Sequence, residues 1–118
     1  PNPSLMTDRK STEILISHQP KIKKQYIIIA QDGRDTEAVD RRMEHRPAHL
    51  AGARRLKEEG VFITGGAILD DQGTMRGSVM ILQFESEEGL KKWMAEEPYI
   101  QNGVWKDLQI KPFRVAEV

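Results

Sequence analysis

From Lys24 onward, apolar runs of strand length alternate with longer amphipathic runs, and this alternation constrains the fold more than any other feature of the sequence. Residues 25–31 (QYIIIAQ) are β-branched and nearly all apolar, which is typical of a central strand that is covered on both faces. The same reading predicts strands over 61–69, 76–84 and 104–115, and helices over 36–59 and 88–95. The predicted order is therefore strand, helix, strand, strand, helix, strand.

This order is typical of a ferredoxin-like βαββαβ domain, an α+β fold whose four-stranded antiparallel sheet carries both helices on one face. The other face of the sheet then has no helical cover. Because the strands supply apolar side chains to both faces, including Ile27, Ile29, Val79 and Ile81, we expect a second copy of the chain to cover it. The sequence predicts a homodimer in which the two open sheet faces meet.

Prolines and glycines indicate where the predicted helices and strands end or become irregular. Pro47 predicts a kink or a restart within the first helix, because proline cannot donate the helical hydrogen bond. Gly65 and Gly66 indicate a bulge or a close approach of a ligand in the second strand, and Pro98 is expected to end the second helix. The first helix should bury the apolar residues that recur at spacings of 3, 4 and 7, which are Val39, Met43, Leu50, Ala53 and Leu56.

The length of 118 residues fits one domain, which we place at 24–118. Residues 1–23 hold three of the six prolines and no sustained periodicity. We interpret them as an N-terminal arm that is in part expression-derived, with a short apolar patch at 14–16 that is the only candidate strand there.

The composition excludes several classes of function. Eighteen basic and eighteen acidic side chains cancel, which disfavours nucleic acid and anionic membranes as partners. Cysteine is absent, so any nucleophile or metal ligand must be nitrogen or oxygen. The longest apolar run, 26–30, is far shorter than the roughly 20 residues that cross a bilayer. Without an export signal, a cytoplasmic location is expected.

Four stretches, in matching order and spacing, carry a resemblance to a known family. They are IAQD at 29–32, RPAHL at 46–50, GSV at 77–79 leading to FES at 84–86, and PYI at 98–100 leading through GV at 103–104 to KPF at 111–113. On these stretches the segment 25–115 resembles the YciI-like (YCII-related) family. The resemblance implies a ferredoxin-like dimer of the dimeric α/β barrel type with a pocket between sheet and helices.

The resemblance also implies an acid–base pair of histidine and carboxylate. The histidine falls on His49, and the carboxylate falls on Glu97, where the family usually has Asp. Asp32 matches a second acidic position of the family and is the alternative partner for His49. A carboxylate hydrogen-bonded to one ring nitrogen fixes the tautomer of histidine and stabilises its cation, so that the ring can act as a base near neutral pH.

Other residues are candidates for holding a substrate rather than for reacting with it. Arg46 offers bidentate hydrogen bonds to an anionic group, and the remaining candidates are Asp32, Gly66, Ser78 and Tyr99. His45 and His49 have a spacing that metal sites use, but two ligands do not hold a metal and Pro47 lies between them. We therefore expect neither a metal nor a cofactor.

Three functional hypotheses follow from the sequence and the resemblance. The first is a cofactor-independent lyase or isomerase in which His49 and Glu97 act on a small cyclic or enolisable substrate by elimination or isomerisation. The second is a non-catalytic homodimer that binds a small ligand or regulates a partner through the same pocket. The third is a purely structural dimer.

Overall fold

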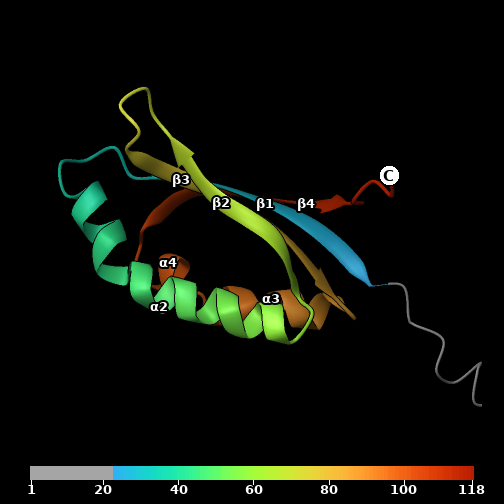
Figure 1. The fold of residues 1–118 in the computed structure, drawn as a ribbon. Coiled ribbons are helices and arrows are strands. Elements are labelled where there is room, and N and C mark those ends of the chain that lie inside the picture. The colour runs from blue at the N-terminus through green and yellow to red at the C-terminus, as the bar shows by residue number, and fades with distance from the viewer. Residues whose placement is uncertain (1–22) are drawn as a thin grey trace, which may run out of the picture.

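A four-stranded antiparallel sheet forms one layer of the molecule, and the helices lie against one of its faces (Figure 1). The computed structural model describes residues 23–118, so the expected arm and its candidate strand at 14–16 lie outside the described residues, except for Lys23. The elements are β1 (Lys24–Asp32), α2 (Ala38–Glu58), β2 (Phe62–Leu69), β3 (Met75–Phe84), α3 (Glu87–Glu96), α4 (Pro98–Gln101) and β4 (Trp105–Phe113).

The strand order is β2-β3-β1-β4, with every neighbouring pair antiparallel. β1, the most β-branched run, is central: Ile28 lies opposite Met80 of β3 on one side and Ile110 of β4 on the other. Pro112 lies in β4, which is an edge strand. Proline is tolerated there because an N–H that faces solvent takes no part in the hydrogen bonds of the sheet. The predicted α+β, ferredoxin-like fold is confirmed.

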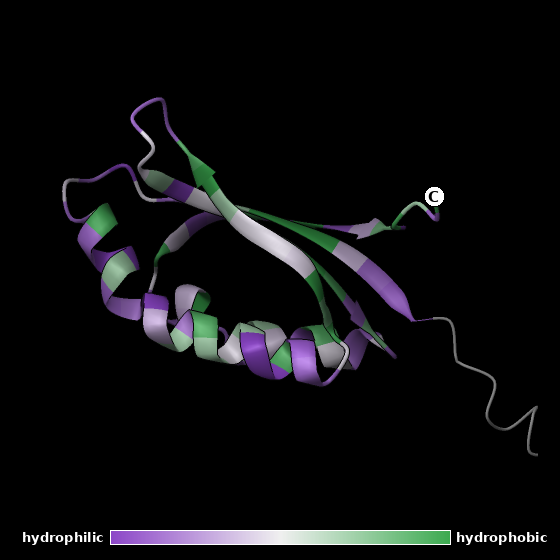
Figure 2. Cartoon of the chain, in the orientation of Figure 1, coloured by the Kyte–Doolittle hydropathy of each residue, from purple (hydrophilic) through white to green (hydrophobic). Residues whose placement is uncertain are grey.

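The hydrophobic core lies between the sheet and the helices. Alternate residues of β1, Tyr26, Ile28 and Ala30, are buried there, and Leu82 and Trp93 join them from β3 and α3. Figure 2 shows apolar residues in green along the central strands and mixed colours along α2. Each fully buried large apolar side chain stabilises the fold by about 1.5–3 kcal/mol, which makes this layer the main stabilising feature.

The opposite face of the sheet has no cover among the described residues. Ile27 and Ile29 of β1 and Val79 and Ile81 of β3 alternate with the core residues and are only half-buried. The apolar character of both sheet faces was predicted from the sequence, and the structure places these four side chains side by side in neighbouring strands.

The buried face of α2 differs from the prediction. The buried residues are Ala38, Arg42 and His49, whereas Met43 is 50% exposed and Arg42 only 3%. The apolar periodicity therefore predicted the wrong buried face for the first half of the helix, although Leu56 near its end does pack on the core. The physical reason is that Arg42 and His49 find polar partners beneath the helix, so their burial does not leave a charge or a ring nitrogen unsolvated.

Pro47 does not interrupt α2. The helix runs without a break over 21 residues with an exposed Pro47 inside it, so the expected restart is wrong, while the ribbon bends along its first half (Figure 1). Even this longest helix is rich in charge, and none of the helices in the described part of the chain is long and apolar enough to span a bilayer.

The glycine pair of β2 lies in regular pairing with β3. The register of β2 shifts between Phe62 and Thr64 and again between Ile68 and Leu69, so the irregularities lie on either side of Gly65 and Gly66 and not at the glycines, where the bulge was predicted. A Cβ on Gly65 would come within 2.7 Å of the carbonyl oxygen of Val79, which explains why a glycine is needed at that position. Gly66 faces open space.

Candidate active site

The turn between α3 and α4 positions the carboxylate of the site. Glu97 ends α3 through its backbone N–H, which donates to the carbonyl of Trp93 at 2.9 Å, and it is also the N-cap of α4. Pro98 at the first position of α4 disfavours a helical conformation at Glu97, whose backbone is extended (φ −66°, ψ 120°). The side chain of Glu97 therefore turns back, and its Oε2 accepts a hydrogen bond from the backbone N–H of Tyr99 at 2.8 Å.

The same carboxylate contacts His49 of α2. Nδ1 of His49 lies 2.8 Å from Oε1 and 3.0 Å from Oε2 of Glu97, and Glu97 is 4% exposed. Because a carboxylate only accepts, Nδ1 carries the proton and Nε2 presents its lone pair in the neutral ring. Nε2 makes no hydrogen bond to any residue of the described segment, and it is not one of the fully enclosed polar atoms. This arrangement suits a general base.

A second buried polar network lies beside this pair. Nη1 of Arg42 donates to both carboxylate oxygens of Asp32 at 3.0 Å. Nη2 of Arg42 donates to Oγ of Ser78 at 2.8 Å, and that oxygen also accepts from Nε1 of Trp105 at 3.2 Å. These contacts join the end of β1, the start of β4 and the middle of β3 to α2. They fix the position of the Arg42 side chain.

Gly77 lets β3 approach β1 closely next to this network. A Cβ at Gly77 would clash with the carbonyl oxygen of Ala30. The glycine therefore allows the neighbouring Ser78 to sit at its observed place opposite Ala30, within reach of Arg42.

The ring of Tyr99 connects the two networks. The imidazole of His49 is stacked on it with ring centroids 4.0 Å apart, and the guanidinium carbon of Arg42 lies 4.8 Å from its centroid. Trp105 packs edge-on against both His49 and Tyr99. Three buried side-chain atoms in this region have no hydrogen-bond partner among the described residues: Nε of Arg42, Nε1 of Trp93 and the hydroxyl of Tyr99.

Burial shifts the protonation equilibria of two residues of the site. It raises the pKa of Asp32 above its ordinary value, although the hydrogen bond and charge of Arg42 act in the other direction. It also raises the pKa of the Tyr99 phenol, which the nearby charges of Arg42 and Arg46 lower only in part. Tyr99 is therefore a neutral hydrogen-bond donor at neutral pH.

A cleft of about 500 Å³ opens between α2 and α3 beside this site. Glu97 and Trp93 line it, together with Gly52, which lies three residues after His49 in α2. Its volume falls in the range of about 300–1,000 Å³ that is common for small-molecule sites. Its remaining walls mix apolar and charged residues, with Leu56, Val61 and Phe84 among the former and Lys23, Arg55, Glu59 and Lys92 among the latter.

The structure brings together most of the site residues that the sequence singled out. His49 and Glu97 are in contact, and Asp32 binds Arg42 instead of His49, so Asp32 is not the partner of the imidazole. Ser78 and Tyr99 belong to the same buried region.

Two of the substrate-binding candidates lie apart from the pair. Arg46 is half-buried, and its charge acts on Tyr99, but the structure records no hydrogen bond for its side chain within residues 23–118. Gly66 pairs with Val79, whose side chain lies on the open face of the sheet. It lines a shallow hollow there with Val79 and Ile81, so it does not reach His49.

Arg42 is a residue of this site that the sequence analysis did not single out. A signal was present, because Arg42 lies seven residues before His49, or about two helical turns, on the same side of α2. Within the described part of the chain, no group of three or more His, Asp or Glu side chains is arranged to hold a metal ion.

Comparison with known proteins identifies the family. The model of the YCII-related domain matches residues 25–114. Protein YciI from Escherichia coli O6:H1 and Protein YciI from Shigella flexneri are each 37% identical to the chain over 95 residues, which is 75% of this chain and 95% of either relative. An uncharacterized protein from Haemophilus influenzae is 36% identical over the same share of both chains.

Solved structures show the same fold. The 5-chloro-2-hydroxyhydroquinone dehydrochlorinase TftG from Burkholderia phenoliruptrix AC1100, in complex with 2,5-dihydroxybenzoquinone, superposes with a TM-score of 0.66 at 22% identity. The match covers 78% of this chain and 95% of TftG. PA3566 from Pseudomonas aeruginosa superposes with a TM-score of 0.54 at 16% identity, over 82% of this chain and 99% of PA3566. By sequence, the chain belongs to the YCII-related, or YciI-like, family.

Proposed function

We propose that this protein is a cofactor-independent enzyme that removes a proton from a small cyclic or enolisable substrate. The observation that carries the proposal is the buried contact between Nδ1 of His49 and the carboxylate of Glu97, which leaves Nε2 of the imidazole without a protein partner in the described segment. A base of this kind contributes about 10²–10⁴-fold to a rate when it is held within reach of the proton.

The proposed chemistry begins at Nε2 of His49. Nε2 takes a proton from carbon or oxygen of the substrate, and the positive charge that forms on the ring is stabilised by Glu97 at Nδ1. In an elimination, a leaving group departs from the neighbouring carbon with its bonding electron pair. In an isomerisation, the imidazolium returns the proton to another atom of the substrate.

The structural likeness to TftG supports an elimination as the first reaction to test. Its name describes a dehydrochlorinase of a chlorinated, hydroxylated ring, and its ligand is a dihydroxylated quinone. A ring of this size fits the cleft of about 500 Å³ beside Glu97.

The test is an assay of chloride release from 5-chloro-2-hydroxyhydroquinone, joined with NMR detection of hydrogen–deuterium exchange at carbon in a panel of small hydroxylated rings and enolisable carbonyl compounds. For a substrate so identified, His49→Gln should lower kcat/KM by about 10²–10⁴-fold. His45→Gln is the matched control, because His45 lies on the same helix and its Nε2 lies 3.7 Å from the exposed carboxylate of Glu44. Full activity in His49→Gln would refute the proposed base.

The non-catalytic alternative is favoured by the closure of the site, since Arg42, His49, Glu97 and Tyr99 are all buried. A ligand-binding module predicts saturable binding of a ring compound, observed by calorimetry, with no product and no proton exchange. The two functions are thus separated by the same panel of compounds.

We further propose that the protein is a homodimer through the open face of the sheet. The support is the group of half-buried apolar side chains at Ile27, Ile29, Val79 and Ile81, which no described element covers. A second copy of the same face would bury these side chains, as an isologous interface requires.

A further inference from the structure

The buried polar atoms without a partner in residues 23–118 lie in one place. They belong to Arg42, Trp93 and Tyr99, and all three residues pack in the aromatic cluster around His49: Arg42 lies over the Tyr99 ring, and Trp93 and Tyr99 both pack against Trp105. Each of the three atoms can donate a hydrogen bond. An unpaired buried donor costs about 1–3 kcal/mol, so three of them in one cluster indicate that an acceptor is missing.

Two of these donors are held firmly beside the proposed base. Arg42 is fixed through its terminal nitrogens by Asp32 and Ser78, which leaves Nε–H as its spare donor. The position of Tyr99 is fixed by its backbone N–H on Glu97 and by stacking on His49, which leaves the hydroxyl as its spare group. Arg42 is 3% exposed and Tyr99 0%, so bulk solvent does not reach these two residues.

We propose that the Tyr99 hydroxyl and the Nε–H of Arg42 together bind an oxygen anion of the substrate, so that the site selects phenols and enolisable carbonyl compounds whose oxygen becomes negatively charged. This assignment of substrate class rests on the proposed function, in which His49 is the base. When Nε2 of His49 takes the proton, the electron pair of the broken bond moves to the substrate oxygen. The two donors then stabilise the phenolate or enolate that forms.

The electrostatics of the cluster agree with this role. Burial raises the pKa of Tyr99, so its hydroxyl keeps its proton and remains a donor. Arg42 adds a positive charge, and its ion pair with Asp32 is made through Nη1 and not through Nε. Hydrogen bonds between such donors and an anionic oxygen are roughly twice as strong as those between neutral groups.

The cleft between α2 and α3 adjoins this cluster through Trp93 and Glu97, which both line it. Glu97 is hydrogen-bonded to both His49 and Tyr99, so one carboxylate connects the wall of the cleft to the imidazole and to the residue that carries the hydroxyl donor. Trp93, whose buried Nε1 is the third unpartnered donor, is the other lining residue of the cluster. A ring bound in the cleft therefore lies next to the residues that hold the base and the two donors.

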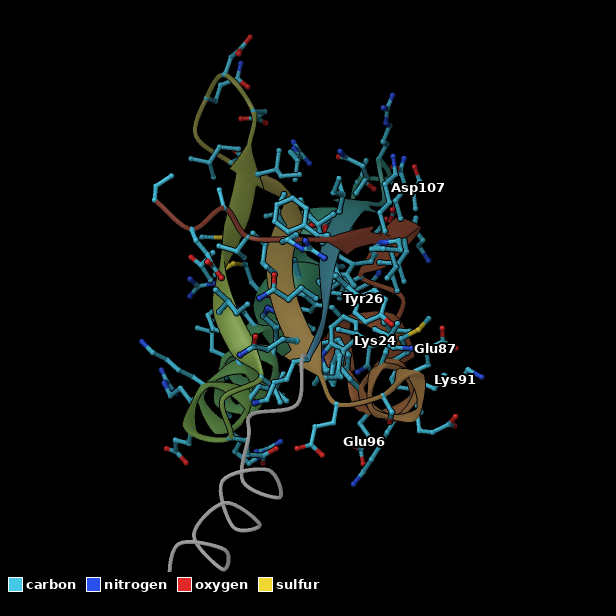
Figure 3. The ribbon with its side chains drawn as sticks, turned by 90° about the vertical axis from the view of Figure 1, so that its right-hand side faces the viewer. Lys24, Tyr26, Glu87, Lys91, Glu96 and Asp107 are labelled. Carbon is cyan, nitrogen blue, oxygen red and sulfur yellow. The ribbon has the colours of Figure 1, made fainter. Side chains whose placement is uncertain are left out.

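The experiment uses 4-nitrophenol as the probe, because its absorption spectrum reports whether the bound form is the phenol or the phenolate. The wild-type protein should bind it as the phenolate. Tyr99→Phe removes only the hydroxyl and should weaken binding by about 10–100-fold, as expected for one hydrogen bond to a charged group. Tyr26→Phe is the matched control, since Tyr26 is also buried but packs on Phe84, beside Lys24 at the end of the sheet (Figure 3).

Stability separates a binding role of Tyr99 from a structural role. Because its hydroxyl has no partner in the described chain, Tyr99→Phe should leave the midpoint of thermal unfolding unchanged or raise it. Equal affinity of Tyr99→Phe and wild type for 4-nitrophenolate, or no binding by the wild type, would overturn the proposal. A crystal structure with the probe in which a water stays bonded to the Tyr99 hydroxyl would do so too.

These outcomes are independent of the test of the base. If His49→Gln loses turnover while Tyr99→Phe binds the phenolate as tightly as wild type, only the oxyanion site is wrong. If Tyr99→Phe alone loses affinity for the phenolate but His49→Gln keeps full turnover, the oxyanion site stands and the proposed base is wrong.

Discussion

The carboxylate of Glu97 makes two separate contacts. It caps α4 by accepting from the N–H of Tyr99, and it holds Nδ1 of His49. The resemblance implies an Asp at this position, and Glu has the longer side chain. Glu97 reaches both partners because the extended backbone before Pro98 turns its side chain inward.

We expect Glu97→Gln to lower kcat/KM by about 10²-fold or more on an identified substrate. The amide can still accept from Tyr99 through its oxygen, but its NH₂ group then faces Nδ1–H of His49. The imidazole relieves this clash of donors by changing tautomer, which moves the proton to Nε2 and removes the base. Kinetics of the variant, with the tautomer assigned by ¹⁵N NMR, provide the measurement.

Glu88→Gln is the control for this substitution, because Glu88 is exposed, lies on α3 and is not among the residues that line the cleft. It removes the same charge from the same helix and should leave kcat/KM unchanged. Equal rates for Glu97→Gln and wild type would show that the carboxylate does not act through His49.

Asp32 and Asp35 should respond to pH in opposite directions. Burial raises the pKa of Asp32 above 3.8, so the folded protein binds this proton at a higher pH than the unfolded chain does. The free energy of unfolding of wild type, minus that of Asp32→Asn, should therefore fall as the pH rises from 3.8 through the pKa of Asp32 in the folded protein. Urea unfolding of both proteins across this pH range measures the difference.

Asp35 provides the comparison. The hydrogen bond from Arg41 lowers the pKa of Asp35, so its ionised form is favoured in the folded state. The free energy of unfolding of wild type should exceed that of Asp35→Asn by a constant amount above pH 3.8. This difference should disappear as the pH falls through the pKa of Asp35 in the folded protein. The same sign of pH dependence at Asp32 and Asp35 would contradict the assigned shifts.

At the scale of the elements, the sequence predicted the order and type of the strands and long helices because their periodicities differ. It did not predict the buried face of α2, because the apolar spacing pointed to a face that leaves out Arg42 and His49. Charged side chains such as that of Arg42, and rings such as that of His49, are stable in the core when they bind a polar partner. Their partners, Asp32 and Glu97, come from other parts of the chain. Such pairing is a tertiary property that local periodicity does not contain.

The short helix α4 was also missed, and with it the reason for the position of Glu97. Pro98 was expected only to end α3, yet the same residue begins α4, where its missing N–H costs nothing. The pair of His49 and Glu97 came from family resemblance, while the geometry that holds it depends on this single turn.

The hairpin of β2 and β3 depends on Asp70. Its Oδ1 accepts from the N–H groups of Gln72 and Thr74, and its Oδ2 accepts from Arg76. These hydrogen bonds lower the pKa of Asp70, so they stabilise the fold above pH 3.8, and this contribution is lost as the pH falls through the folded pKa. Asp70→Asn should therefore lower the unfolding temperature at pH 7 and have a smaller effect at low pH.

The exposed neighbour Asp71 is the control for the hairpin. Asp71→Asn removes one negative charge from the same turn without weakening the charge-assisted hydrogen bonds that Asp70 accepts. Differential scanning calorimetry should show a smaller change in unfolding temperature for Asp71→Asn than for Asp70→Asn at pH 7. Equal changes would mean that charge, and not the hydrogen bonds of the turn, sets the effect.

At the scale of the whole molecule, one layer of helices on one layer of sheet leaves a sheet face that no element of residues 23–118 covers (Figure 1). Ile29 lies near the middle of that face, opposite Val79 of β3, and is half-buried even in the single chain. If two such faces meet, a charge at this position is placed between two apolar sheets and loses its hydration. Ionised groups in that situation are strongly destabilising.

We therefore expect the wild-type protein to sediment with twice the mass of one chain, and Ile29→Lys to sediment as a folded single chain in analytical ultracentrifugation. Met43→Lys is the matched control: Met43 is a large apolar residue that is 50% exposed, but it lies on α2, on the other side of the sheet, so its variant should remain a dimer. A single-chain mass for the wild type at micromolar concentration would show that the open face has another partner or none. A dimer in Ile29→Lys would instead place the interface elsewhere, because a lysine at the centre of two packed sheets is incompatible with their contact.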